Sequence, residues 1–234
     1  MSIIFPMHIS RDNVRTYYEQ NTRLFIAFGN GRRAENIHRG LWTEGVRTLE
    51  EALNVTNEWI RAEIEHATPT HARVADLGCG VGASLFHIIP RLTEPDYAVG
   101  ITLSPLQARL AGNSARQLNL SDRTVFVESD FAHLPVDTGC LDAAYAVEAV
   151  AHAQHPESVF YEASRVLRKG GRWIVLDDFR ADRTLTAAEA KWLDAFIHGW
   201  HVPGVITANQ AETFAQRYQL QLVKSEDLRQ LLRL

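Results

Sequence analysis

Cysteines, long apolar runs and basic clusters are scarce in this sequence, and each scarcity excludes a class of protein. Cys79 and Cys140 are the only cysteines among 234 residues, and they form no Cys-x-x-Cys motif. We therefore expect neither a disulfide scaffold nor a structural zinc site. No segment approaches the roughly 18 uninterrupted apolar residues of a membrane span, so no membrane-spanning helix is expected.

Positive charge is equally sparse. The formal net charge is −4, and basic residues such as Arg32-Arg33 occur only as isolated pairs. A nucleic-acid partner is not expected, because phosphate recognition needs clustered lysine and arginine. Met1–Pro6 has neither the basic start nor the apolar run of a secretory signal, which predicts a cytoplasmic protein.

What the sequence does contain is an alternation of apolar strands and amphipathic helices from residue 73 onward. The predicted strands lie at about 73–77, 97–101, 124–128, 141–146, 172–177 and 219–225. The predicted helices lie at about 82–92, 105–119, 157–168, 186–199 and 208–217. This order predicts an α/β fold, a Rossmann-like doubly wound and mostly parallel sheet with helices on both faces.

The residues before this alternation have helical spacing. A first helix is predicted through Tyr17 and Tyr18, capped by Ser10 or Asp12, and a second from Thr43 to about residue 65. A glycine-rich loop, residues 28–33, separates them. This lead-in is longer than the sheet needs, so we expect it to cover the site as a lid that excludes water.

The stretch from Val74 to Ala83 predicts a strand, a tight turn and the start of a helix. Gly78, Gly80 and Gly82 allow a ligand to approach the backbone, and the helix N-terminus adds free N–H groups. The stretch fits Asp-x-Gly-x-Gly-x-Gly, which follows the first strand of S-adenosylmethionine (SAM)-dependent methyltransferases. It also fits a relaxed dinucleotide fingerprint, Gly-x-Gly-x-x-Ala.

The residues after the second and third strands help to separate these two interpretations. A dinucleotide enzyme, like most class I SAM-dependent methyltransferases, would place an acid after the second strand to bind the ribose. This chain has Thr102 and Gln107 there, which can make neutral hydrogen bonds worth about 1 kcal/mol each, although Ser104-Pro105 also reads simply as a helix start. Asp130 and Phe131 follow the third strand.

These motifs, together with Arg165–Gly171, occur in order over about 73–178 and resemble class I SAM-dependent methyltransferases. The similarity is greatest to the sterol, tocopherol, cyclopropane-type and prenyl-diphosphate C-methyltransferase branch. The resemblance implies S-adenosyl-L-methionine as cofactor. It implies cofactor contacts at Tyr17, Tyr18, Asp76, Gly78, Cys79, Gly80, Thr102, Gln107, Asp130, Phe131 and Val147.

Within this set the residues have separate expected tasks. Asp76 suits the methionine ammonium, and the N–H groups of the glycine turn suit its carboxylate. Asp130 would accept from the adenine amino group while Phe131 packs on the ring. Tyr17 and Tyr18 would close over the methionine end, although paired tyrosines on a helix can equally be plain packing.

Glu148 and His152 are the candidate catalytic residues. They lie four residues apart, so they would share one face if the segment after the fourth strand is helical. Glu148 could stabilise developing positive charge and either residue could take a proton, but a plain surface pair is also possible. His152 and His155 lack a third ligand nearby, so no metal is expected.

The sequence therefore predicts a SAM-dependent methyltransferase acting on a small apolar isoprenoid or aromatic acceptor of specialised metabolism, with C-methylation slightly favoured over O- or N-methylation. The alternative is an NAD-dependent oxidoreductase. We expect one domain over 1–234, comprising a lid (1–70), a cofactor core (73–178), a substrate cap (179–218) and a final strand with a helical tail (219–234). No seventh strand is predicted, so a homodimer or the tail is expected to cover the sheet edge.

Overall fold

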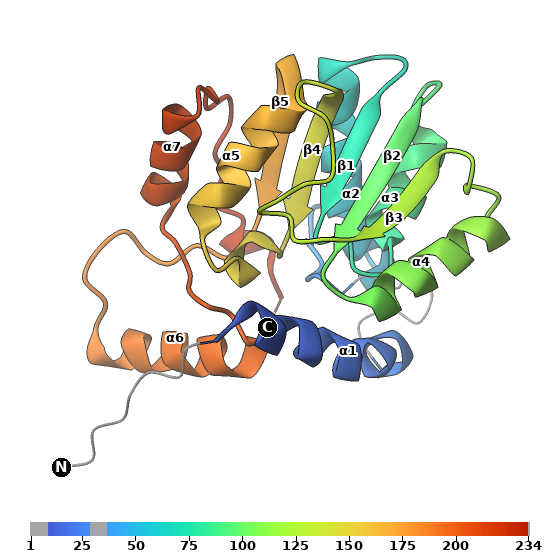
Figure 1. The fold of residues 1–234 in the computed structure, drawn as a ribbon. Helices are drawn as coiled ribbons and strands as arrows, with labels where there is room; N and C mark the ends of the chain where they lie inside the picture. The colour runs from blue at the N-terminus through green and yellow to red at the C-terminus, as the bar shows by residue number, and fades with distance from the viewer. Residues whose placement is uncertain (1–8, 29–36, 234) are drawn as a thin grey trace.

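The computed structural model describes residues 9–28 and 37–233, and its centre is a parallel five-stranded sheet (Figure 1). The strands are β1 (Arg73–Leu77), β2 (Tyr97–Thr102), β3 (Thr124–Glu128), β4 (Leu141–Val147) and β5 (Leu167–Leu176), in the order β3-β2-β1-β4-β5. The α-helices are α1 (Arg11–Phe28), α2 (Leu49–Ala67), α3 (Ala83–Ile88), α4 (Pro105–Gln117), α5 (Pro156–Val166), α6 (Ala187–Trp200) and α7 (Ala208–Arg217). Short 3₁₀ turns are η1 (Ile89–Arg91), η2 (Val150–His152) and η3 (Arg229–Leu231).

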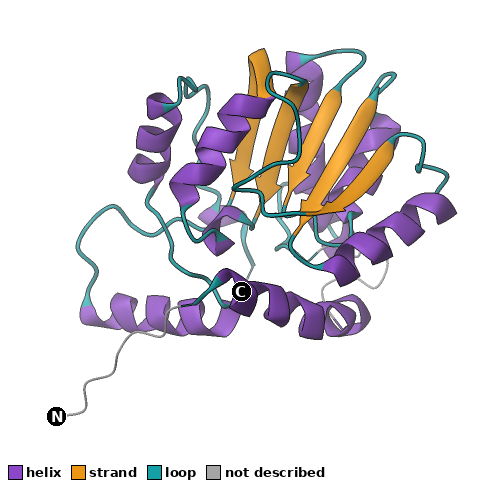
Figure 2. Cartoon of the chain, viewed as in Figure 1, coloured by secondary structure: helices purple, strands orange, loops and turns teal. Residues whose placement is uncertain are grey.

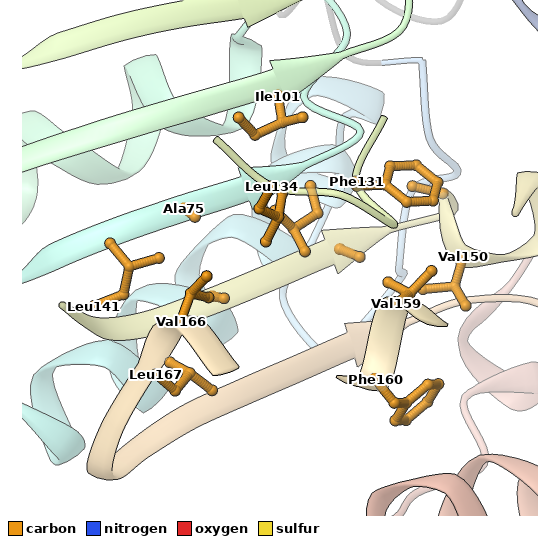
Figure 3. Packing of buried hydrophobic residues seen from close by; sticks show 14 of the residues in the cluster. Ala75, Ile101, Phe131, Leu134, Leu141, Val150, Val159, Phe160, Val166 and Leu167 are labelled. Carbon is orange, nitrogen blue, oxygen red and sulfur yellow. The ribbon is translucent and has the colours of Figure 1, made fainter. Parts of the chain in front are cut away.

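Alternate residues of the central strands supply two separate cores, one on each face of the sheet. Figure 2 shows the helices that lie on the two faces. On one face, Ala75 and Leu77 of β1 pack with α5, whose Val159 and Phe160 are buried (Figure 3). On the other face, Val74 packs with α2 and α3. Because β1 is covered on both faces, it is apolar almost throughout, as buried parallel strands are.

The chain order changes direction between β1 and β4, because β2 and β3 lie on one side of β1 and β4 and β5 on the other. Ligands of open α/β sheets bind outside the carboxyl ends of the strands at such a point. In Figure 1 the strands point toward α1 and α6, which lie across this end of the sheet. The fold therefore places two helices from opposite ends of the chain over the expected site.

The predicted α/β fold is confirmed, but several expected boundaries are wrong. The second helix begins at Leu49 rather than Thr43, because Thr48 forms a capping box with Glu51. β5 begins at Leu167, five residues before the expected start at 172. The glycine-rich loop at 28–33 falls largely outside the described residues.

The expected strand at 219–225 is not formed in the described chain, and the tail has only the short turn η3 instead of a helix. Leu222 and Val223 are 49% and 66% exposed, so no neighbouring strand covers this segment. The tail that follows instead contacts the segment before α2, where the backbone N–H of Trp42 donates to the Leu231 carbonyl at 2.8 Å. The sheet, as described, therefore ends at β5.

Candidate active site

A cavity of about 250 Å³ lies at the carboxyl ends of the strands. Its floor comes from the glycine turn after β1 and from the residues after β2, β4 and β5. Val14 and Tyr18 of α1 and Phe196 and Trp200 of α6 also line it. Its polar, glycine and apolar lining residues include Tyr18, His38, Arg39, Asp76, Gly78, Cys79, Gly80, Thr102, Gln107, Phe131, Val147, Glu148, His152, Asp177 and Asp178.

The glycine turn approaches both the cavity and the segment after β4. Gly78 has φ +90°, and a Cβ atom there would lie 2.4 Å from the Ala149 side chain. Gly80 has φ +55° and open space beside it, since the nearest atom to its Cβ position, on Ile37, is 3.9 Å away. Gly78 therefore permits the close packing of two loops, and Gly80 leaves room on the cavity side.

The N–H groups of this turn are less available than expected. Those of Gly78 and Cys79 both donate to the Ile101 carbonyl at 2.9 Å, which ties the turn to the end of β2. A carboxylate ligand would therefore have to use later N–H groups of the turn. The Cys79 side chain is buried, and burial raises the pKa of its thiol well above the usual value.

Asp76 is a buried carboxyl group at the end of β1, with 3% of its surface exposed. Burial raises the pKa of Asp76 to about 7, while the neighbouring Tyr145 hydroxyl opposes the shift. A carboxylate here is costly unless a positive group accompanies it. The cavity thus contains an acid whose ionisation would be favoured by a bound cation.

Thr102 and Gln107 meet as expected and belong to a larger network. The Thr102 hydroxyl donates to the Gln107 side-chain oxygen at 2.7 Å, and the Gln107 amide nitrogen donates to the Thr22 hydroxyl of α1 at 3.0 Å. Ser104 caps α4 and also donates to Glu19, whose carboxylate accepts from the Leu106 N–H at 3.0 Å. These contacts tie α1 to the start of α4 and close that side of the cavity.

Of the neighbouring residues Asp130 and Phe131, Phe131 alone lines the cavity. Phe131 is 6% exposed and lines the cavity, whereas Asp130 is not among the lining residues. One Asp130 oxygen accepts from the Ala132 N–H at 2.9 Å, and the other lies 3.8 Å from Arg11. Contact between Asp130 and an adenine amino group therefore stays a prediction, without support from the cavity as described.

Glu148 and His152 do not lie on a common helix, so that expectation is wrong. Glu148 has φ +47°, a left-handed conformation that is strained for a residue other than glycine. Its N–H donates to the Leu176 carbonyl at 2.7 Å, and the helical turn that follows is only η2. Asp177 stabilises this strained turn, because its carboxylate accepts from the N–H groups of Ala149 and Val150 at 2.9 and 2.7 Å.

Arg39 forms an ion pair with the Glu148 carboxylate. Its backbone N–H and its Nε donate to Glu148 Oε1 at 3.0 and 3.1 Å, and its Nη2 donates to Asp178 at 2.6 Å. Burial opposes the charge on Arg39, but its two acidic partners raise the pKa of the guanidinium. Burial also raises the pKa of Asp177 to about 7.

His152 contacts the lid instead of Glu148. Its Nε2 lies 2.9 Å from the Tyr18 hydroxyl, and burial lowers the pKa of His152 to about 4. Burial raises the pKa of Tyr18, because it disfavours the charged form of the phenol as it does that of the imidazole. Tyr17 is not a lining residue but stacks on His201 at a centroid distance of 4.8 Å.

Sequence reasoning missed His38 and Arg39, both of which line the cavity. They lie far upstream of the motifs, and the only sequence signal was a His-Arg pair before the apolar Gly40-Leu41-Trp42. Within the described ranges, no group of three or more His, Cys, Asp or Glu side chains is arranged to hold a metal ion. None of the helices in residues 9–28 and 37–233 has the length and apolarity of a membrane span.

Comparison with known proteins agrees with this geometry. A family model described as "Methyltransferase domain" matches residues 75–175. The 27-O-demethylrifamycin SV methyltransferase of Amycolatopsis mediterranei is 30% identical over 202 residues, which cover 85% of this chain and 71% of that protein. The chain belongs to the class I SAM-dependent methyltransferases.

S-adenosyl-L-methionine is the cofactor of this methyltransferase, and the dinucleotide alternative is not supported. A sterol 4-C-methyltransferase of Caenorhabditis elegans is 27% identical over 188 residues, covering 77% of this chain and 53% of that protein. The chain thus spans about half the length of this protein and of a 24-methylenesterol C-methyltransferase of Oryza sativa.

The fold has solved counterparts in the same family. Geranyl diphosphate C-methyltransferase of Streptomyces coelicolor, solved with geranyl diphosphate and S-adenosyl-L-homocysteine (SAH), superposes with a TM-score of 0.78 at 19% identity, covering 96% of this chain and 84% of that one. A cyclopropane synthase of Mycobacterium tuberculosis gives a TM-score of 0.80 at 18% identity, covering 98% and 80% of the two chains. At these identities the likeness concerns the fold.

Proposed function

We propose that the chain transfers a methyl group from SAM to a small, mainly apolar acceptor. The observation that supports this most is the charge of the cavity. Asp76, Glu148, Asp177 and Asp178 line it, and Arg39 is the one lining arginine among the described residues. This excess of carboxyl groups favours a cofactor with a sulfonium and an ammonium.

The residues around the cavity suit the parts of this cofactor. Asp76 would pair with the ammonium, which compensates a carboxylate that is otherwise expensive to bury. Thr102 and Gln107 would bind the ribose hydroxyls, and Phe131 and Val147 would supply apolar walls. The bound cofactor supplies an electrophilic methyl group, so the protein's main task is to position the acceptor and exclude water.

The acceptor side of the cavity is aromatic and apolar. Phe196 and Trp200 of α6 and Val14 of α1 line it, which suits an isoprenoid or an aromatic ring. Tyr18 would close over the site from α1, where it already contacts His152. The relatives include a sterol C-methyltransferase and an O-methyltransferase, and we retain C-methylation as the first expectation.

Glu148 is the proposed residue that stabilises positive charge developing on the acceptor. Its strained backbone and the Asp177 contacts to the following N–H groups fix its position at the cavity. Glu148→Gln should therefore lower turnover far more than SAH affinity. An equal loss of both would contradict this role.

Calorimetry and mass spectrometry test the proposal as a whole. We expect SAH to bind and NADH not to bind, and binding of neither would contradict the function. A panel of geranyl diphosphate, phenols and indoles, incubated with SAM bearing a labelled methyl group, should yield a product with the corresponding mass shift. NMR of that product would then show whether carbon, oxygen or nitrogen carries the methyl group.

A further inference from the structure

His38 is a buried histidine of the cavity, and neither cofactor binding nor charge stabilisation by Glu148 involves it. It lines the cavity, yet only 7% of its surface is exposed. Its Nδ1 lies 3.0 Å from the Arg39 carbonyl oxygen. Its Nε2 is buried and has no hydrogen-bond partner among the described residues.

The carbonyl partner determines which ring nitrogen carries the proton. A carbonyl oxygen only accepts, so Nδ1 must be the donor and carry the hydrogen. Burial lowers the pKa of His38, although the Arg39 carbonyl and the charge of Glu148 oppose the shift. The ring is therefore neutral, and Nε2 holds a free lone pair.

Two other candidate bases of the cavity, Glu148 and His152, already have hydrogen-bond partners. Glu148 Oε1 accepts two hydrogen bonds from Arg39. His152 uses Nε2 in its contact with the Tyr18 hydroxyl. Its Nδ1 is also buried without a partner among the described residues, but burial lowers the pKa of His152 to about 4, which makes it a weak base. A buried acceptor without a partner, such as His38 Nε2, costs free energy, and such groups in native proteins call for an explanation.

Methyl transfer to a neutral hydroxyl or alkene carbon requires a proton acceptor. The S–CH₃ bond breaks, a C–CH₃ or O–CH₃ bond forms, and the acceptor acquires a positive charge that it loses by releasing one proton. We propose that His38 Nε2 takes this proton. The resulting imidazolium would be stabilised by Glu148, whose charge already favours the protonated ring, and would return the proton to water after product release.

This inference rests on the proposed methyl transfer, but its first test does not depend on an acceptor. In the SAH-bound protein with ¹⁵N-labelled histidine, the His38 signals are those missing from the His38→Asn variant. We expect these signals to show a neutral ring at pH 7, protonated at Nδ1 and unprotonated at Nε2. A ring protonated at Nε2 could not accept a proton there and would overturn the inference.

The second test uses the first acceptor that the panel of geranyl diphosphate, phenols and indoles identifies. His38→Asn keeps a donor for the Arg39 carbonyl but lacks Nε2, so kcat should fall about 100-fold or more while the SAH affinity changes little. Added imidazole should partly restore kcat of His38→Ala, which a purely structural role would not allow. His71→Asn is the matched control, because His71 has a 64% exposed side chain.

Retention of near-wild-type kcat by His38→Asn would overturn the inference. If one variant folds poorly, two results still test the inference. These are the tautomer measured in the wild-type protein and the kcat of the variant that folds. Failure of the proposed function would look different, because the wild-type protein would then bind no SAH and methylate no member of the panel.

Discussion

The buried position of Asp76 predicts that SAH binds more tightly as the pH rises. In the ligand-free protein the pKa of Asp76 is raised to about 7 by burial. The ammonium of SAH should favour the carboxylate, which lowers this pKa in the complex and releases a proton on binding. Affinity should therefore be retained above pH 7 and lost progressively as the pH falls below it.

The magnitude follows from the ionised fraction of Asp76 in the free protein. With a pKa of about 7, this fraction is about 9% at pH 6 and about 91% at pH 8, so Kd for SAH should fall about tenfold across this interval. The SAH ammonium is an ordinary amino-acid group that stays largely protonated over the same range. The titration should be run calorimetrically in buffers of different ionisation enthalpy, which also counts the released protons.

Asp76→Asn is the decisive control for this prediction. The amide cannot ionise, so affinity at pH 8 should fall at least about tenfold, as expected when a charged partner is lost. The residual binding should depend less on pH between 6 and 8 than in the wild-type protein, because Asp177 is then the remaining cavity carboxyl group with a pKa of about 7. A wild-type pH dependence that survives unchanged in Asp76→Asn would refute the assignment of Asp76 to the ammonium.

Three further predictions follow from the packing around the site. Gly78→Ala should lower the free energy of unfolding by about 2 kcal/mol or more in urea titrations, because its Cβ would clash with Ala149 at a positive φ. Gly112→Ala, which has open space on α4, should be neutral or stabilising and serves as its control. Asp177→Ala should lower kcat by releasing the strained Glu148 turn; an unchanged kcat would show that Asp177 has no positioning role. The edge of β5 should be covered in a homodimer, and a monodisperse monomer in sedimentation would count against that expectation.

Local chemistry was sufficient to predict most of the sheet. The apolar residues Val74, Ala75 and Leu77 and the alternation that follows predict strands that agree with β1 and β3 in the structure. The Ser104-Pro105 pair predicted the start of α4, where Ser104 indeed caps the helix. Each of these elements is specified by neighbours in sequence, through side-chain period, caps and glycine turns.

Local chemistry misled where a tertiary partner decides the outcome. Leu220 and Leu222 alternate like a strand, but no strand pairs with this segment in the described chain, so the pattern has no hydrogen-bonding partner. The spacing of Glu148 and His152 suggested one helical face. Instead the Leu176 carbonyl and the Asp177 carboxylate hold the Glu148 turn in another conformation.

The sequence by itself determined the doubly wound sheet and the family, because ordered motifs and apolar periods are local properties. Only the tertiary structure decided which side chains meet at the cavity. Arg39 reaches Glu148 across 109 residues, and Tyr18 reaches His152 across 134. The buried Nε2 of His38 became apparent in the same way, since its lack of a partner within residues 9–28 and 37–233 depends on the tertiary packing around it. Such contacts join segments that are far apart in the sequence, so no local pattern predicts them.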